Sequence, residues 1–207
     1  QSSGIGGGAF ILHHDGHRIE AYDGRETAPA AATEKLFLDL NGNAIGFQEA
    51  VASGLSVGVP GTLSVLALAH QEHGKLPWAR LIQPAIDLAL NGFRISPRLH
   101  AALLETPDLK KDPVALRYFF DANGFPFLIG HVLKNPELAR VLKDIAAHGD
   151  RALKEGTWAQ AIVQKVQQHP MRPGAMTLQD LAHYKALKRE ALCFDYSAQK
   201  LRSEERR

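Results

Sequence analysis

The segment DGRETAP, from Asp23 to Pro29, places an arginine between two carboxylates at the exit of an apolar run. A planar guanidinium matches the two oxygens of a carboxylate, so Arg25 is a candidate receptor for an anionic group of a ligand. Asp23 and Glu26 flank this arginine and can hold its fork in one orientation. The same residues also fit a structural ion-pair network at a strand–helix junction, and their spacing leaves both interpretations open.

A glycine-rich stretch, GIGGG at residues 4–8, is the second candidate. A dinucleotide-binding loop needs a strand before it and a helix after it, and a Walker loop needs Gly-Lys followed by Ser or Thr. Here a strand-like run follows the glycines, and the Walker residues are absent. We therefore expect tight turns and close backbone approach at this stretch rather than phosphate binding.

Histidines form two groups that could bind a metal. His13, His14 and His17 lie across a predicted hairpin, and His70 and His73 are three positions apart in a predicted helix. Zinc needs three or four converging ligands. Because no cysteine or carboxylate is spaced to complete either set, we predict surface or core-edge histidines, with no metal and no cofactor.

Composition narrows the class of protein. The 207 residues, 45% of them apolar, suffice for a buried core. A net charge of +2 is too small to indicate a nucleic-acid partner. The sequence has no apolar run of about 18 residues, so we predict no membrane span, and no signal peptide is visible. Cys193 is the single cysteine, and its neighbours (ALCFDY) predict a packed thiol in a buried strand rather than a nucleophile.

The elements that must position these candidates predict an α+β chain. Asp15-Gly16 separates two short apolar runs, 9–14 and 17–22, which is typical of a β-hairpin. A bent strand is expected at 53–62, and one terminal strand at 191–196. Helical spacing, proline starts and glycine stops predict helices at 29–40, 61–73, 77–90, 96–105, 136–147, 157–168 and 177–184. Pro84 should kink or split the third of these helices.

Several motifs in a fixed order resemble the γ-glutamyltranspeptidase family. QSSGIGGGAF, DGRETAP, SGLSVGVPGT and HGKLPWARLIQPAIDLALNGF are followed by FLIGHVLKNPELARVLKDIAAHG, AIVQKV and TLQDLAHYKAL. The resemblance covers nearly all of residues 1–192. It implies a partial αββα sandwich of the N-terminal nucleophile hydrolase type. It also implies a precursor that cuts itself into a large and a small subunit.

The chemistry implied by this resemblance is acyl transfer. The new N-terminal Thr of the small subunit attacks the γ-glutamyl amide of glutathione or a related substrate, and its own α-amine can serve as the base. An oxyanion hole stabilises the tetrahedral intermediate, and water or an acceptor amine then takes the acyl group. By the same resemblance, Arg25 contacts the α-carboxylate of the γ-glutamyl substrate, and the protein is periplasmic or extracellular.

Only the large-subunit side of the family is matched. We expect residues 1–196 to be a large-subunit fragment, cut short at both ends, and residues 197–207 to be a charged tail outside the family. No catalytic residue is assigned in this chain, because the Thr nucleophile is expected in the missing small subunit, which is the predicted partner. The chain alone is expected to be inactive. A β-lactam acylase of the cephalosporin type and an inactive remnant remain alternatives.

Overall fold

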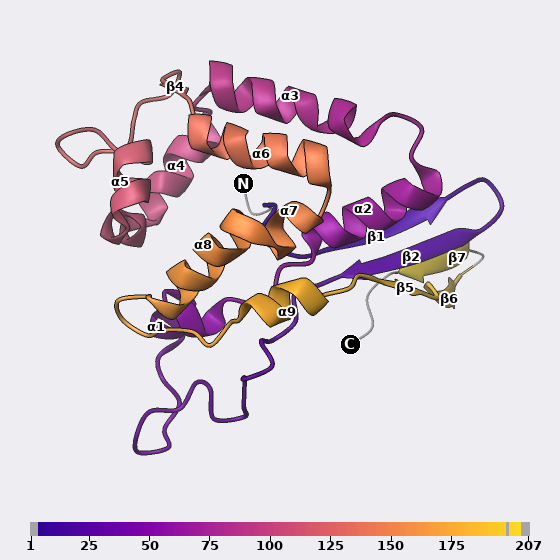
Figure 1. Cartoon of the computed structure of the whole chain (residues 1–207), viewed down its shortest axis with the longest axis horizontal. Coiled ribbons are helices and arrows are strands. Elements are labelled where there is room, and N and C mark those ends of the chain that lie inside the picture. Colours follow the sequence, from indigo (N-terminus) through magenta and orange to yellow (C-terminus); the bar gives the residue numbers. More distant parts are fainter. Residues whose placement is uncertain (1–3, 198, 204–207) are drawn as a thin grey trace. The chain divides into compact units, whose positions relative to one another are not determined.

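The computed structural model describes residues 4–197 and 199–203, which fall into two compact units. Residues 79–147 form one unit, which we call the helical unit. The remaining described residues, 4–78 with 148–197 and 199–203, form the hairpin unit, which carries the candidate site (Figure 1). Each unit has its own buried residues.

Amphipathic helices build the helical unit. Its elements are α3 (Trp78–Asn91), β3 (Phe93–Arg94), α4 (Pro97–Glu105), the 3-10 helix η2 (Pro107–Lys111), α5 (Pro113–Phe119), β4 (Val132–Leu133) and α6 (Pro136–His148). Pro84, which was predicted to kink or split this helix, lies inside α3 and does not split it. Ser96 caps α4 by accepting a hydrogen bond from the Leu99 N–H at 3.1 Å.

The hairpin unit is built on a three-stranded antiparallel sheet in the order β1-β2-β5. Its elements are β1 (Ala9–His14), β2 (Ile19–Gly24), α1 (Phe47–Val51), the 3-10 helix η1 (Gly54–Ser56), α2 (Thr62–His73), α7 (Arg151–Lys154), α8 (Gly156–Gln167), α9 (Leu178–His183), β5 (Leu187–Arg189), β6 (Leu192–Tyr196) and β7 (Gln199–Ser203). Within this unit, α2 packs against β1 and β2. Helices therefore cover the hairpin, as in an α+β chain.

The predicted hairpin is confirmed, and its turn has a clear cause. Asp15 accepts backbone hydrogen bonds from His17 and Arg18, both at 2.8 Å, and Gly16 has a φ of +101°. An aspartate side chain and a left-handed glycine together fix such a turn. The register pairs His13 with Glu20 and Ala9 with Gly24, so the two ends of the hairpin are set by one turn.

A helix at 29–40 is not observed, and the prediction is wrong there. Most of the segment forms turns, with an isolated bridge between Leu38 and Ala44. The Asp39 side chain accepts hydrogen bonds from the N–H groups of Asn41 and Asn43, at 2.9 and 2.8 Å. Such side-chain bonds compete with a helix, and this exposed segment has no continuous apolar stripe against the core to offset them.

The C-terminal part contains three short strands where the sequence predicted one. Leu187–Arg189 pairs with β2, and Leu192–Tyr196 pairs with Gln199–Ser203. The last of these lies in the segment 197–207 that was expected to be a charged tail. Cys193 is exposed on β6, so the prediction of a packed thiol is wrong. Within the described residues β6 pairs only with β7, and Phe194 of β6 is exposed, as Cys193 is.

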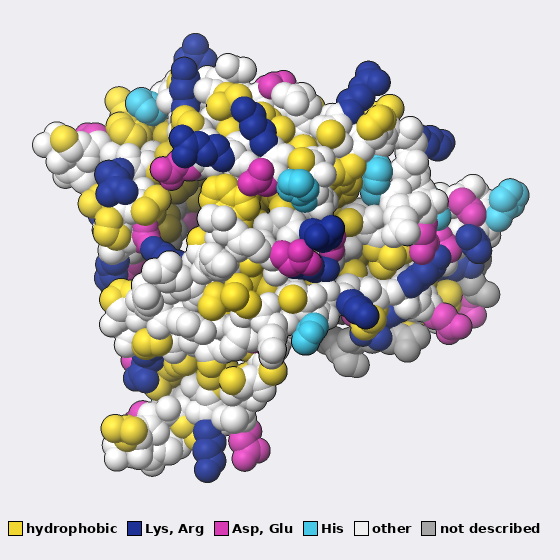
Figure 2. Space-filling model, viewed as in Figure 1, with side chains coloured by type: hydrophobic (Ala, Val, Ile, Leu, Met, Phe, Trp, Pro, Cys, Tyr) yellow, Lys and Arg dark blue, Asp and Glu magenta, His cyan; other side chains and the backbone are white. Residues whose placement is uncertain are grey.

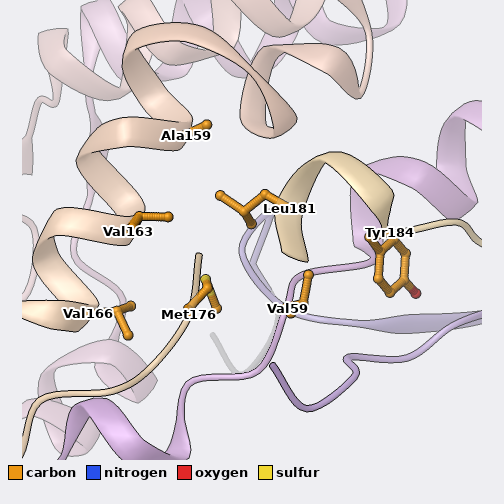
Figure 3. Close-up of a cluster of buried hydrophobic side chains, with 7 residues drawn as sticks. All are labelled: Val59, Ala159, Val163, Val166, Met176, Leu181 and Tyr184. Carbon is orange, nitrogen blue, oxygen red and sulfur yellow. The ribbon is translucent and has the colours of Figure 1, made fainter. Parts of the chain in front are cut away.

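The segment 53–62 forms a short helical turn and an extended piece rather than a continuous bent strand. Ser53 caps the 3-10 helix, and Val59 forms an isolated bridge with Thr27. Val59 also belongs to a buried cluster that joins α8, α9 and the segment between them (Figure 3). Its members are Val59, Ala159, Val163, Val166, Met176, Leu181 and Tyr184.

Candidate functional site

Arg25 directly follows the last residue of β2, where the chain leaves the sheet. Its side chain is 57% exposed, and its Nη1 lies 2.8 Å from Oε2 of Glu26. Among the residues that the structure describes, Glu26 is the one carboxylate within ion-pair distance of this guanidinium. Since a guanidinium has five N–H donors in a fork, most of its donors remain available to a second carboxylate.

An open groove of about 530 Å³ adjoins Arg25. The groove belongs entirely to the hairpin unit. Its lining residues are Gly6, Arg25, Glu26, Thr27, Ala28, Pro29, Leu36, Phe37, Leu55, Ser56, Val57 and Gly58. A volume of this size is within the range of small-ligand sites, about 300–1,000 Å³. Apolar walls with one forked cation suit a small molecule that carries a carboxylate.

Backbone hydrogen bonds fix the peptide that carries Arg25. The N–H of Arg25 donates to Oδ1 of Asp23 at 3.0 Å, and the Tyr184 hydroxyl donates to the Arg25 carbonyl oxygen at 2.7 Å. Asp23 is itself held by Arg189 of β5, whose Nε lies 2.7 Å from Oδ2. The sequence placed Asp23 and Glu26 beside Arg25, whereas nothing in the spacing pointed to Tyr184 or Arg189.

The glycines of the GIGGG stretch allow the chain to approach this site closely, as predicted. The Gly7 carbonyl oxygen accepts hydrogen bonds from the N–H groups of Gly61 and Thr62, at 2.9 and 3.0 Å. A Cβ added at Gly8 would lie 2.8 Å from the backbone nitrogen of Glu26, which is too close for any side chain. The stretch therefore packs its bare backbone against the start of α2 and against the Arg25 loop.

The predicted histidine groups are rearranged by the fold. The structure brings together His13 of β1 and His73 of α2, whose ring centroids are 3.7 Å apart with an interplanar angle of 13°. His14, His17 and His70 are not part of this cluster. Glu20 joins it from the position opposite His13, with Oε2 at 2.8 Å from Nε2 of His73. The expectation that no carboxylate could complete a set is wrong, because cross-strand pairing supplies one.

The geometry of this cluster favours an ion network over a metal centre. The candidate ligand atoms of His13, Glu20 and His73 lie within 4.8 Å of one another. However, imidazole lone pairs lie in the ring plane, so two parallel stacked rings do not direct them at one ion. Oε1 of Glu20 is already paired with Lys188 at 2.6 Å and with Arg18 at 3.1 Å. These cations satisfy the carboxylate that a metal would need.

Hydrogen bonds set the ionisation of this network. The hydrogen bond from Lys188 lowers the pKa of Glu20 and of Glu72 below the ordinary glutamate value. The same two carboxylates raise the pKa of Lys188. Burial, together with the hydrogen bond to Glu72, raises the pKa of Tyr22 well above the ordinary tyrosine value. The carboxylates and the lysine therefore stay charged, and the phenol stays neutral, across the physiological range.

The chain matches one family of known proteins over nearly its whole length. The family model described as Gamma-glutamyltranspeptidase matches residues 1–205. The chain belongs to the gamma-glutamyltranspeptidase family. The segment that carries Arg25 and the C-terminal segment that carries Tyr184 both lie within the match.

Relatives of this chain include glutathione hydrolases from a plant and a bacterium. Glutathione hydrolase 2 of Arabidopsis thaliana is 39% identical over 193 residues, which make up 92% of this chain and 32% of that protein. The glutathione hydrolase proenzyme of Bacillus subtilis (strain 168) is 39% identical over 196 residues, or 94% of this chain and 33% of that protein. The chain thus spans about a third of the length of these relatives.

Solved structures agree with the family and confirm the fold class. The gamma-glutamyltranspeptidase of Helicobacter pylori matches with a TM-score of 0.91 and 30% identity, over 99% of this chain and 58% of that chain. A cephalosporin acylase from Bacillus halodurans matches with a TM-score of 0.77 and 24% identity, over 96% of this chain and 37% of that one. The second likeness is one of fold. The chain is therefore an α+β chain of the N-terminal nucleophile hydrolase type.

None of the helices within the described residues combines the length and the apolar character needed to cross a membrane.

Proposed function

We propose that this chain forms the substrate-carboxylate side of a glutathione hydrolase or γ-glutamyltransferase, with Arg25 binding the α-carboxylate of the γ-glutamyl group. The observation that carries the proposal is an exposed guanidinium with one carboxylate partner at the rim of a 530 Å³ groove. Its relatives among the glutathione hydrolases supply the substrate class.

The geometry gives Arg25 two tasks in such a reaction. Its fork would accept both oxygens of the α-carboxylate, which fixes the orientation of the glutamyl group as well as its charge. The ion pair with Glu26 would keep the guanidinium at the rim when the groove is empty. Holding the substrate at this end places its γ-amide at a fixed distance, where a nucleophile supplied from outside this chain would act.

The nucleophile and the partner complete the proposal. The Thr would come from the small subunit of the same precursor, after the precursor cuts itself, and the chain alone would be inactive. Residues 1–196 would be the large-subunit portion, residues 197–207 would lie outside it, and the protein would work in the periplasm or outside the cell. The segment 29–46 and the helix α1 that follows it expose several large hydrophobic side chains, and this exposure supports a partner surface (Figures 1 and 2). They are Phe37, Leu38, Leu40 and Phe47.

Arg25→Ala and Arg25→Lys in the full-length processed protein test the assignment. With a γ-glutamyl anilide as substrate, Arg25→Ala should lower kcat/KM by roughly 30- to 800-fold, which corresponds to about 2–4 kcal/mol of transition-state binding. Arg25→Lys should recover only part of this loss, because a point charge cannot fork. Arg151→Ala is the matched control, since Arg151 is also exposed and is paired with one glutamate, Glu155. An unchanged kcat/KM in Arg25→Ala would contradict the proposal.

The lone chain provides a second test. It should give no turnover of the anilide, and adding the remainder of the precursor should restore activity. Turnover by the lone chain would overturn the assignment of the nucleophile to another subunit. Turnover of a cephalosporin side-chain amide in place of the anilide by the complete protein would favour the acylase instead, and inactivity towards both would favour a remnant.

A further inference from the structure

Both polar groups of the Arg25 backbone are bound by side chains. The N–H donates to Asp23, and the carbonyl oxygen accepts from the Tyr184 hydroxyl. Asp23 is in turn tied to Arg189. Tyr184 and Arg189 lie in the C-terminal segment of the hairpin unit, so this segment contacts the Arg25 loop at two points.

Tyr184 is anchored by its ring, and its hydroxyl donates to the Arg25 carbonyl oxygen. Its ring is 7% exposed and packs in the buried cluster of Figure 3, next to Leu181 and Val59. Figure 3 shows its hydroxyl oxygen on the side of the ring away from Met176. Burial raises the pKa of this phenol, so the hydroxyl keeps its proton at neutral pH. The hydroxyl is thus a rigid donor at a fixed position.

Bare backbone makes room for this hydroxyl. A Cβ at Gly61 would overlap both the Tyr184 hydroxyl and the carbonyl oxygen of Gly24. A Cβ at Gly24 would overlap the side chain of Val65 in α2. The strand end, the start of α2 and the phenol therefore lie in close contact, which restricts the peptide between Gly24 and Arg25.

We propose that Tyr184, together with the Asp23–Arg189 pair, is a positioning residue that holds the Arg25 peptide so that the guanidinium meets the substrate carboxylate in one orientation. This proposal rests on the proposed role of Arg25. Tyr184 does not touch the substrate. Its contribution is to remove backbone freedom from Arg25 before the substrate arrives, which lowers the entropic cost of forming the forked contact.

Tyr184→Phe in the full-length processed protein is the first test. The variant keeps the buried ring and removes only the donor. We expect KM for a γ-glutamyl anilide to rise about 3- to 10-fold while kcat changes less than about 2-fold, as the loss of one hydrogen bond predicts. Tyr118→Phe is the matched control, because Tyr118 is a half-buried tyrosine of the helical unit, and its KM should not change.

A double-mutant cycle separates positioning from general stability. If Tyr184 acts through Arg25, Tyr184→Phe should have no further effect on KM in an Arg25→Ala background. It should also leave unchanged the slow turnover of a 4-aminobutyryl anilide, which lacks the α-carboxylate. A lowered melting temperature with an unchanged KM would show a merely structural role and overturn the proposal. Equal effects on both anilides would overturn it as well.

The proposed role of Arg25 and the positioning role of Tyr184 can fail separately. If Arg25→Ala has no effect, the proposed function fails. If Arg25→Ala is strongly impaired and Tyr184→Phe is not, only the positioning role fails. Should Tyr184→Phe not fold, Arg189→Ala tests the same clamp from the other side, since Arg189 is 41% exposed and outside the buried cluster. Its KM should rise about 2- to 3-fold, and an unchanged KM would count against the proposal.

Discussion

The two ends of the β1–β2 hairpin carry charge in different ways. Near the turn, the Glu20 side chain is only 7% exposed and contacts Arg18, His73 and Lys188. At the other end, the Arg25 side chain is 57% exposed and pairs with one glutamate. Both ends belong to one pair of strands with a single register. We call the turn end the closed end, because its charged groups pair with one another, and the Arg25 end the open end, because it adjoins a groove.

This difference teaches how to tell a structural charge cluster from a ligand site. At the turn end, Glu20 and Glu72 each have more than one cationic or hydroxyl partner, so neither carboxylate needs a ligand to satisfy it. At the Arg25 end, the backbone is fully bonded while the guanidinium keeps spare donors. A rigid backbone under an unsatisfied side chain is what a pre-organised binding group requires.

Gly61→Ala should have the largest effect, and it acts at the open end of the hairpin. The added methyl group would overlap the Tyr184 hydroxyl and the Gly24 carbonyl oxygen, so we expect a loss of about 2–3 kcal/mol in the free energy of unfolding. Urea unfolding of the full-length protein measures this. Gly46→Ala is the control, because a Cβ at Gly46 meets nothing within 4 Å. Equal stability of the two variants would show that the contact at Gly61 is not close.

Glu20→Ala should have the next largest effect, and it acts at the closed end of the hairpin. Its removal leaves Lys188 and Arg18 without their buried carboxylate, so the melting temperature should fall by several degrees. KM for the γ-glutamyl anilide should stay within about 2-fold, because the closed end does not touch the groove. Glu155→Ala, at an exposed pair, should change neither quantity. A large change of KM in Glu20→Ala would show that the closed end influences substrate binding, which contradicts the distinction between the two ends.

The closed end should also make the stability of the protein fall at acid pH. Lys188 holds the pKa of Glu20 and Glu72 below the ordinary value of 4.5. This stabilisation is complete above that value and is lost as the pH falls through the lowered pKa of the folded state. For Lys188, with its raised pKa, stabilisation is complete below the ordinary 10.5 and is lost as the pH rises through the folded value. Melting curves down to about pH 3 should show the acid loss. A Glu20→Gln/Glu72→Gln variant should show a flatter acid limb.

Thr177→Ala should give the smallest effect. Thr177 and Asp180 form a capping box at the start of α9, the helix that leads into Tyr184. Losing the threonine cap should cost about 1 kcal/mol of stability. KM should rise by less than in Tyr184→Phe, because the hydroxyl of Tyr184 is kept. A larger rise of KM than in Tyr184→Phe would mean that α9 acts on the site by another route.

Local signals predicted the hairpin and most of the helices. Asp15-Gly16 predicted the turn, and Ser96 before Pro97 predicted the start of α4, because both signals act through residues that are close in sequence. The segment 29–40 misled, since its helical composition has no core face to bury. The residue Arg25 was found through its neighbours, and its role came from the family resemblance.

Long-range contacts could not be predicted from the pattern. Tyr184 reaches the Arg25 carbonyl across 159 positions, and Lys188 reaches Glu72 across 116. Glu20 joins His73 only because β2 packs against the last turns of α2. Such partners depend on how elements dock, which periodicity and spacing do not encode.

The clamp on Arg25 has a consequence for synthesis. The ribosome makes Arg25 159 residues before Tyr184. At about 5–20 residues per second, the nascent chain therefore waits roughly 10–30 s with Arg25 at a strand end that is not yet held in place. The β1–β2 hairpin can close during that interval, but the site cannot assume its final shape until the C-terminal segment has left the exit tunnel. Ribosome-bound chains that end before residue 184 should thus contain the hairpin and lack the ordered arginine.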